Sequence, residues 1–266
     1  MRGFPPERIV CLTEETVETL YLLGEEHRIV GVSGYAVRPK RVRKEKPRVS
    51  AFTSADIPKI LALDPDLVLT FSDLQADIAA ELIRAGVSVM AYNQRDVAGI
   101  LAMIRHLGTM VGAADRAMHL VDQYERRLDQ LASQSAGQMS RPRVYFEEWD
   151  APMISGIRWV SELIEIAGGI DVFPQQAKAQ AATDRIVTSE QVIAAAPDVI
   201  LASWCGKKVR REKIAARTGW DSLPAVRDAR IFEIKSPLIL QPGPAALTDG
   251  LDAIVLGLGH ADATHP

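Results

Sequence analysis

Short runs of aliphatic and β-branched residues alternate with segments of helical periodicity along most of this chain of 266 residues. This alternation is typical of βα units that build a mainly parallel sheet. The predicted strands lie at residues 8–12, 29–33, 67–71 and 87–91, and then at 143–146, 199–203 and 231–234. The pattern therefore predicts an α/β fold with strands in both halves of the chain.

The two halves also resemble each other in sequence. The segment ILALDPDLVLT at residues 60–70 matches VIAAAPDVILA at residues 192–202 in residue type at nearly every position. Each segment predicts the end of a helix, a Pro-Asp turn and a buried strand. Such turns are common in α/β proteins, which leaves a chance similarity open, but we favour two lobes of similar topology.

Several helix starts can be recognised. Thr13 precedes Glu14 and Glu15, whose negative charges suit a helix N-terminus. Capping boxes are predicted at residues 72–75, from Ser72 and Gln75, and at residues 188–191.

Residues 113–131 contain no Gly or Pro and place apolar residues at helical spacing. They predict one amphipathic helix of about 28 Å at about 1.5 Å per residue. Residues 133–140 predict a flexible exit from it. The predicted organisation is thus an N-terminal α/β lobe at residues 1–112, a linking helix segment at 113–140 and a C-terminal α/β lobe at 141–266. Both lobes are expected to be Rossmann-like.

The composition narrows the class of protein. Hydrophobic residues make up 47% and charged residues 24% of the chain, as in a folded globular protein. No apolar stretch reaches the roughly 18 residues of a membrane span. The two cysteines lie far apart, which excludes a disulfide framework. The first residues lack an export signal, which predicts a cytoplasmic location, although removal of a signal would leave a periplasmic protein looking the same.

The formal net charge of −3 hides two basic runs. Residues 38–48 hold seven Lys or Arg and one acid, and residues 207–217 hold six and one. Such runs are often solvated loops. The alternative is a local positive field that attracts an anionic ligand, or an acidic protein partner at residues 207–217.

Aromatic residues gather where strands end. They form only 6% of the chain, yet Tyr35, Tyr92, Trp149 and Trp204 all follow predicted strands. Ligands of open parallel sheets bind at this edge, and aromatic surfaces suit a large, flat or amphipathic ligand. The alternative is that each ring packs under its own loop. The predicted ligand-binding residues are Tyr35, Phe52, Ser72, Tyr92, Glu148, Trp149, Trp159, Trp204, Cys205 and Pro242.

Signals for catalysis are weak. Glu147 and Asp150 are neighbours on one loop and would seldom reach opposite faces of a substrate. Cys205 has no histidine near it in sequence, and a metal site from Glu147, Glu148 and Cys205 lacks a spacing signature. No phosphate-binding loop is present, and the basic runs lack the interleaved aromatics of a nucleic-acid site. We therefore expect no enzyme, no catalytic or metal-ligating residues and no nucleic-acid partner.

Five segments carry a family pattern: RIVCLTEETVETLYLLGEEHRIVGVSGY, DIPKILALDPDLVLT, PRVYFEEWDAPMISG, WVSELIEIAGG and SEQVIAAAPDVILAS. With them the chain resembles, over residues 8–258, the substrate-binding proteins with a helical backbone. These serve importers of cobalamin, haem and ferric siderophores, and the cobalamin binders are nearest in pattern. The resemblance implies a class III periplasmic-binding-protein-like fold. It places Tyr35 and Phe52 against a corrin ring from the first lobe, and Trp149 with residues 155–156 in the matching loop of the second.

One departure from this family concerns its transporter. Exported members dock through one acidic residue at the tip of each lobe, which arginines of the membrane subunits receive. Asp77 is the counterpart in the first lobe, whereas the second-lobe stretch is the basic GKKVRREKIAAR. This stretch would repel an arginine pocket, so docking on an ABC transporter is doubtful and a cytoplasmic relative is expected.

The predicted function is therefore the non-catalytic binding of a large metal chelate in a cleft between two lobes. Cobalamin or another corrinoid is the first choice, as a ligand and not as a catalytic cofactor. The alternative within this class is a ferric siderophore or haem, bound as the solute-binding component of an ABC importer. From another class, the alternative is a small metal-dependent hydrolase that uses Glu147, Glu148 or Cys205.

Overall fold

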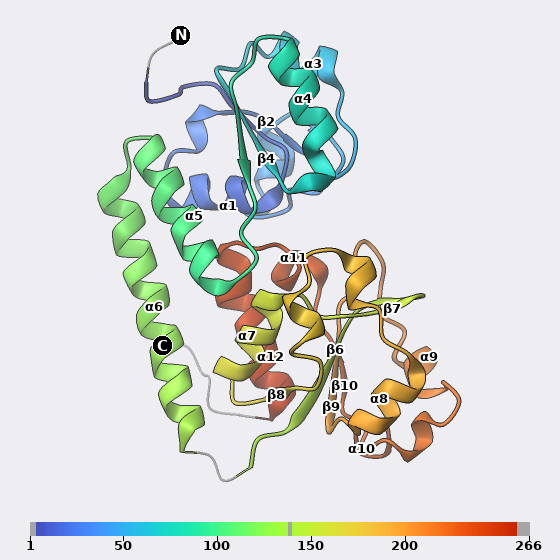
Figure 1. The fold of residues 1–266 in the computed structure, drawn as a ribbon. Coiled ribbons are helices and arrows are strands. Elements are labelled where there is room, and N and C mark those ends of the chain that lie inside the picture. Colours follow the sequence, from blue (N-terminus) through green and yellow to red (C-terminus); the bar gives the residue numbers. More distant parts are fainter. Residues whose placement is uncertain (1–3, 138–139, 260–266) are drawn as a thin grey trace. The chain divides into compact units, whose positions relative to one another are not determined.

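The computed structural model describes residues 4–137 and 140–259, which divide into two compact units (Figure 1). Unit 1 is the described part of Met1–Gln94 together with Ala98–Gln123, and unit 2 is Arg95–Val97 with the described part of Tyr124–Pro266. The sequence prediction treated residues 113–140 as a separate segment. In the structure, residues up to Gln123 belong to unit 1 and those from Tyr124 to unit 2.

Unit 1 is built on a five-stranded parallel sheet with the order β3-β2-β1-β4-β5. Its strands are β1 (Ile9–Cys11), β2 (Ile29–Ser33), β3 (Arg48–Ser50), β4 (Leu67–Phe71) and β5 (Val89–Tyr92). The four strands predicted for this half are confirmed. The sequence did not predict β3, because this strand is only three residues long and begins inside a basic run that has no apolar pattern.

Helices cover both faces of this sheet (Figure 1). They are α1 (Glu14–Leu22), α2 (Val42–Glu45), α3 (Ile57–Ala62), α4 (Ala76–Arg84), α5 (Val97–Met110) and the start of α6 (Ala114–Ala136), with short helices η1 (Glu26–Arg28) and η2 (Asp73–Gln75). On one face, Val10, Leu12 and Val68 pack against α3 and α4. Strand residues alternate between faces, so Ile9 and Cys11 point toward α1 and α5 on the other.

Unit 2 contains a mixed sheet with the order β10-β9-β6-β7, and β8 pairs with the start of β6. Its strands are β6 (Arg143–Asp150), β7 (Met153–Ser155), β8 (Ile170–Asp171), β9 (Val199–Ala202) and β10 (Ile231–Glu233). The three strands predicted here are confirmed, but β6 continues to Asp150, so Glu147, Glu148 and Trp149 lie within the strand and not on a loop after it, because this part of β6 pairs with β7. The short β7 and β8 were missed, and β7 is antiparallel to β6, so this edge is a hairpin and not a βα unit.

Two layers of helices also flank the sheet of unit 2 (Figure 1). They are α7 (Arg158–Ile166), α8 (Ser189–Ala195), α9 (Arg211–Ala215), α10 (Pro224–Arg227), α11 (Ser236–Ile239) and α12 (Leu251–Leu258), with η3 (Gln176–Lys178), η4 (Ala182–Arg185), η5 (Trp220–Ser222) and η6 (Ala246–Gly250). The larger core cluster, which includes Tyr145, Trp204 and Trp220, lies on the face covered by α8 to α10. The repeated segments both hold a helix end, a turn and a strand, as predicted: α3 to β4 and α8 to β9.

One of the two predicted capping boxes is present. The Thr188 hydroxyl accepts a hydrogen bond from the Gln191 backbone N–H, and the Gln191 side chain accepts one from the Thr188 N–H. The box predicted at Ser72 is present only in part. The Ser72 hydroxyl caps η2 and accepts from the Leu74 N–H over 3.3 Å, but the Gln75 side chain accepts from the N–H of Phe71 and not from that of Ser72, whose φ is 57°.

The predicted long helix is confirmed as α6, which is continuous over 23 residues. It extends to Ala136, so the predicted flexible exit at residues 133–140 is wrong at its start, and residues 138–139 lie outside the described part. Within unit 1 its first turns lie very close to α5. A Cβ added to Gly108 would lie 2.2 Å from the Cβ of Ala117, which requires glycine at this crossing.

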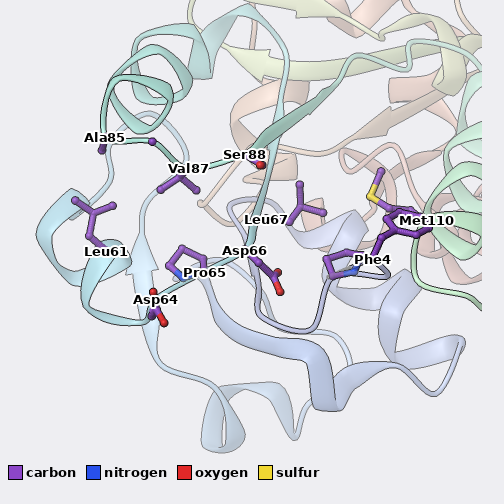
Figure 2. A pocket seen from close by; sticks show the side chains of 12 residues that line it. Phe4, Leu61, Asp64, Pro65, Asp66, Leu67, Ala85, Val87, Ser88 and Met110 are labelled. Carbon is purple, nitrogen blue, oxygen red and sulfur yellow. The ribbon is translucent and has the colours of Figure 1, made fainter. Parts of the chain in front are cut away.

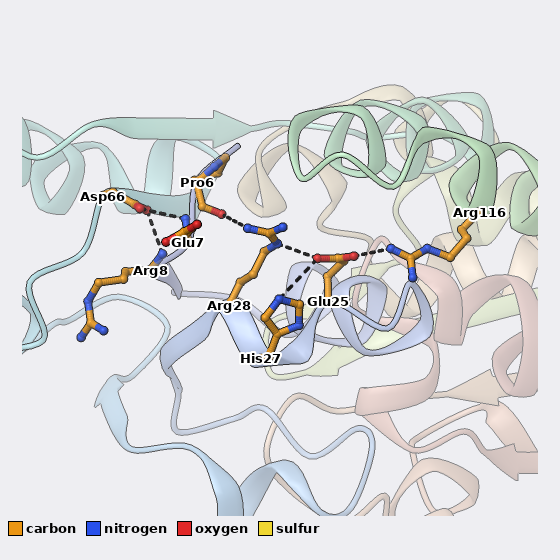
Figure 3. Close-up of polar contacts among 8 residues, drawn as sticks. All are labelled: Pro6, Glu7, Arg8, Glu25, His27, Arg28, Asp66 and Arg116. Atoms are coloured by element: carbon orange, nitrogen blue, oxygen red, sulfur yellow. Dashed lines mark hydrogen bonds and ion pairs between the residues drawn. The ribbon is translucent and has the colours of Figure 1, made fainter. Parts of the chain in front are cut away.

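A buried carboxylate connects three parts of unit 1 (Figure 3). The Glu25 side chain is 8% exposed and accepts a hydrogen bond of 2.5 Å from Arg28 Nε and another from Arg116, on α6. Arg28 also donates to the carbonyl of Pro6 over 2.9 Å. Burial works against ionisation of Glu25, but the two guanidinium groups hold its pKa below the usual value.

We expect Glu25→Gln to lower the free energy of unfolding by about 1–3 kcal/mol at pH 7, because a buried group loses charge-assisted bonds. A lowered pKa stabilises the fold above the unfolded-state value of about 4.3, and this contribution disappears as the pH falls through the folded-state pKa. The difference between variant and wild type in denaturant titrations should therefore vanish in acid. Glu26→Gln is the control, since Glu26 pairs with the exposed Arg41 and should cost under about 1 kcal/mol. Equal effects of the two variants would contradict the role of Glu25.

Candidate functional site

The exits of the unit 1 strands carry the four residues predicted there. Tyr35 follows β2 and is 50% exposed, while Phe52, two residues after β3, is half-buried. Ser72 and Tyr92 are buried, and the Ser72 N–H donates to the carbonyl of Tyr92 over 2.8 Å. Tyr35 and Phe52 are therefore the aromatic surfaces that this edge offers. Tyr92 instead packs inward, with its hydroxyl 3.0 Å from Nδ1 of His106 on α5.

A side chain outside the predicted set organises this edge. Gln75 is 1% exposed, and its amide donates to the carbonyls of Leu12 and Phe52 over 3.3 and 2.8 Å. Its oxygen accepts from the Phe71 N–H over 2.9 Å. Gln75 thus holds together the exits of β1, β3 and β4. The capping-box pattern singled out this residue but assigned it the wrong partner.

Two buried carboxyl groups follow β1. Glu15 is 1% exposed and accepts a hydrogen bond of 2.5 Å from the Thr13 hydroxyl, and Glu14 is 9% exposed. Burial raises the pKa of Glu14 to about 7 and that of Glu15 to about 8, and the neighbouring charge of Glu14 adds to the second shift. The sequence analysis expected two charged groups at a helix N-terminus. Their burial makes Glu15 largely a neutral acid at neutral pH.

Near the ends of β6 and β9 in unit 2, Trp149 and Trp204 both contact one ammonium group. The Lys207 Nζ lies 4.1 Å from the ring centre of Trp149 and 4.9 Å from that of Trp204. It also donates to an Asp150 carboxylate oxygen over 2.5 Å. The structure therefore brings these two predicted aromatic residues together, but around a lysine that the analysis had assigned to a free basic run.

Below this cluster, Glu147 is fully buried. Arg217 binds it through two nitrogens, one of them at 3.0 Å, and Trp204 Nε1 and the Tyr145 hydroxyl donate to it over 3.1 and 3.2 Å. Glu148, a predicted ligand residue, is bound by both terminal nitrogens of the buried Arg185 at 2.6 and 3.0 Å. Both carboxylates that could serve a hydrolase are thus held by arginines.

The remaining predicted site residues do not form one group. Trp159 is 3% exposed on α7 and donates to the carbonyl of Ile239 over 2.9 Å, so it belongs to the core. Cys205 is exposed and Pro242 is buried. Among the described residues, no three His, Cys, Asp or Glu side chains gather in a way that could hold a metal ion.

Several cations of the two basic runs are bound to acidic side chains or backbone carbonyls. In the first, Arg38 and Arg41 pair with Glu18 and Glu26 at 2.7 and 2.8 Å, and Lys46 donates to two backbone carbonyls. In the second, the terminal cations Lys207 and Arg217 bind acids of β6, as described above. The positive surface of the second run is thus limited to the residues between them. None of the helices in the described ranges is both long and apolar enough to span a bilayer.

A cavity of about 550 Å³ lies at the opposite edge of unit 1, where its strands begin (Figure 2). Leu61 and Val87 line one end, and Phe4 and Met110 the other. Both carboxylate oxygens of Asp66 accept backbone N–H bonds, from Glu7 and Arg8 at 2.8 and 3.0 Å (Figure 3). The cavity contains none of the predicted ligand residues.

The acids after β1 make stability depend on pH. The pKa of Glu15 is raised to about 8, so the folded state holds a proton that the unfolded chain releases above about pH 4.3, and stability falls as the pH rises through this interval. We expect Glu15→Gln to be at least about 1 kcal/mol more stable than the wild type at pH 9, and to show a flatter pH profile. Denaturant titrations from pH 5 to 9 measure this difference.

The matched control is Glu18→Gln on the same helix. Glu18 pairs with Arg38 at 2.7 Å, so the same substitution should lower stability. Parallel pH profiles for the wild type and Glu15→Gln would contradict the burial of an acid at this position.

Comparison with known proteins places this geometry in a family. A model of the periplasmic binding proteins matches residues 9–238. An uncharacterised ABC transporter substrate-binding lipoprotein of Bacillus subtilis is 24% identical over 258 residues, which are 94% of this chain and 79% of that protein. A vitamin B12-binding protein of Vibrio parahaemolyticus is 25% identical over 254 residues, 93% of this chain and 88% of the relative.

A solved structure supports the same assignment. The periplasmic haem-binding protein of Roseiflexus, in its apo form, superimposes with a TM-score of 0.80 at 25% identity, over 95% of this chain and 99% of that one. The predicted fold class, two α/β lobes joined by a long helix, is confirmed as that of class III periplasmic binding proteins. The chain therefore belongs to the periplasmic binding protein family.

Proposed function

We propose that this protein binds a large metal chelate without a catalytic step, and that cobalamin or another corrinoid is its ligand. The observation that carries the proposal is the placement of accessible aromatic side chains at or near strand ends in both units: Tyr35 and Phe52 in unit 1, and Trp149, near the end of β6, in unit 2. Flat rings of this kind suit a macrocycle. The vitamin B12-binding relatives, at about 25% identity, support the same ligand class.

The polar groups at these exits favour binding over catalysis. Glu147 and Glu148 are held by Arg217 and Arg185, so neither is placed as a free base or metal ligand. Glu15 holds a proton under burial and accepts from Thr13. Such fixed groups can position a ligand, but they form no pair of nucleophile and base.

Haem or a ferric siderophore is the second candidate. The observation that favours it is the cluster of basic residues that follows Trp204, which would attract the carboxylates of such ligands. The haem-binding relative of known structure supports this class as well.

A ligand panel tests the proposal. Purified protein is titrated with cyanocobalamin, haemin and ferric catecholate and hydroxamate siderophores, and tryptophan fluorescence and visible absorbance are followed. Saturable binding of cyanocobalamin tighter than that of the other ligands supports the corrinoid. Tighter binding of haemin or a siderophore selects the second candidate, and no binding of any chelate contradicts both.

We expect Trp149→Ala and Tyr35→Ala each to weaken binding of the chelate selected by this panel by about 1–3 kcal/mol, because each removes a flat contact surface. The fold should remain intact, since Trp149 is only half-buried and Tyr35 is exposed. Dissociation constants from fluorescence and unfolding curves measure both effects. Trp159→Phe is the control, because Trp159 lies in the core and should change stability more than affinity. Unchanged affinity in both alanine variants would place the site elsewhere.

We further propose that the protein acts inside the cell and not on an importer. Lys208, Arg211 and Lys213 are exposed on the segment where exported relatives are expected to present an acid, and they would repel an arginine pocket. The protein should therefore fail to stimulate transport by a reconstituted cobalamin importer, with an authentic periplasmic binding protein as the positive control. Stimulation by the unmodified protein would contradict this location.

A further inference from the structure

We propose that Lys207 is a specificity-determining residue of unit 2: it favours ligands that carry a carboxylate over ligands that present only flat, uncharged faces. This inference rests on the proposed binding of a metal chelate, and within that class it favours the second candidate, haem or a ferric siderophore. It starts from the cluster of Trp149, Trp204 and Asp150 around the Lys207 ammonium, which is defined here as the lysine cage.

A tight turn of the backbone places Lys207 in this cage. The Lys207 N–H donates to the carbonyl of Trp204 over 3.3 Å, which closes a tight turn after β9. Gly206, in this turn, has a φ of 72°, a conformation that favours glycine. Asp150, at the end of β6, then holds the ammonium at 2.5 Å. Lys207 is therefore fixed by its backbone and by an ion pair.

The ammonium lies over an aromatic surface that a flat ligand would use, the half-buried ring of Trp149. Trp204, which it also contacts, is only 3% exposed and belongs to the core cluster of unit 2. An uncharged flat ligand has to displace the ammonium, with loss of two cation–π contacts and of the ion pair to Asp150. Lys207 thus opposes ligands of this kind.

A carboxylate ligand can instead bind with Lys207 in place. The Lys207 side chain is 42% exposed, and an ammonium has three N–H donors, of which Asp150 takes one. Of the nearby acids, Glu147 and Glu148 are balanced by Arg217 and Arg185.

The charges that follow Lys207 point the same way. Lys208, Arg210, Arg211 and Lys213 lie on the next residues, against one acid, Glu212. The field around the cage is therefore positive despite Asp150, and it favours an anionic ligand.

The test compares two chelates on matched variants. Haemin carries two carboxylates, whereas cyanocobalamin has no net charge and no carboxylate. The measured quantity is the ratio of their dissociation constants. We expect Lys207→Ala to shift this ratio toward cyanocobalamin by roughly tenfold, because the variant removes a charge-assisted bond to one ligand and an obstacle to the other.

Asp150→Asn gives the opposite test. It leaves the ammonium without its carboxylate and should shift the ratio toward haemin. Lys178→Ala, which removes an exposed lysine of unit 2 outside the cage, controls for net charge and should leave the ratio unchanged. An unchanged ratio for Lys207→Ala, or shifts of the same sign for Lys207→Ala and Asp150→Asn, would overturn the inference.

The inference can fail independently of the proposed function. If the wild type binds neither chelate, the proposed function fails. The same ratio is then measured for naphthalene-2-carboxylate and naphthalene-2-carboxamide, which differ only in the charged group. A preference of the wild type for the carboxylate that Lys207→Ala abolishes supports the role of Lys207, and the absence of such a preference overturns it.

Discussion

The burial of Glu147 within β6 is the constraint on which the unit 2 site depends. A fully buried carboxylate is tolerated only when its oxygens are bonded and its charge is balanced. Arg217, Trp204 and Tyr145 meet this need, and in doing so they draw the segment after β9 back onto β6. The segment from Trp204 to Arg217 is thus attached to Glu147 at both of its ends. The turn that places Lys207 over Trp149 lies within this segment.

The architecture could be predicted from the sequence because its strands and helices follow patterns of apolar residues that extend over many positions. Strands such as β2 and β4 are mostly apolar runs, and α6 is a long segment without Gly or Pro, so their local signals agree with the fold. The strands missed, β3, β7 and β8, have two or three residues each with only one or two apolar ones, whereas the equally short β1 and β10 lie in longer runs rich in apolar residues. The capping box at Ser72 forms only in part for another reason. Ser72 caps η2, but its φ of 57°, which no residue pattern predicts, leaves Gln75 bonded to the N–H of Phe71 instead of that of Ser72.

The candidate site could be predicted only in part, because residue type does not reveal the partner. Reasoning from strand ends selected Trp149, which is half-buried, but it also selected Tyr92 and Trp204, which are buried and pack inward. Counts of charged residues likewise could not show which cations are paired with acids. Arg217 and Lys207 belong by sequence to a basic run, but their partners, Glu147 and Asp150, lie 70 and 57 residues away. Only the fold brings such pairs together.

The two units treat a buried acid near their first strand in different ways. After β1, Glu15 meets the Thr13 hydroxyl and no guanidinium is bonded to it among the described contacts, so burial raises its pKa to about 8 and the group remains largely protonated at neutral pH. Within β6, Glu147 is instead bonded to Arg217 in an ion pair. A buried acid with a pKa of about 8 changes its charge near neutral pH. The pH dependence of ligand binding that arises from Glu15 should therefore be found in unit 1, and charge selection among ligands in unit 2.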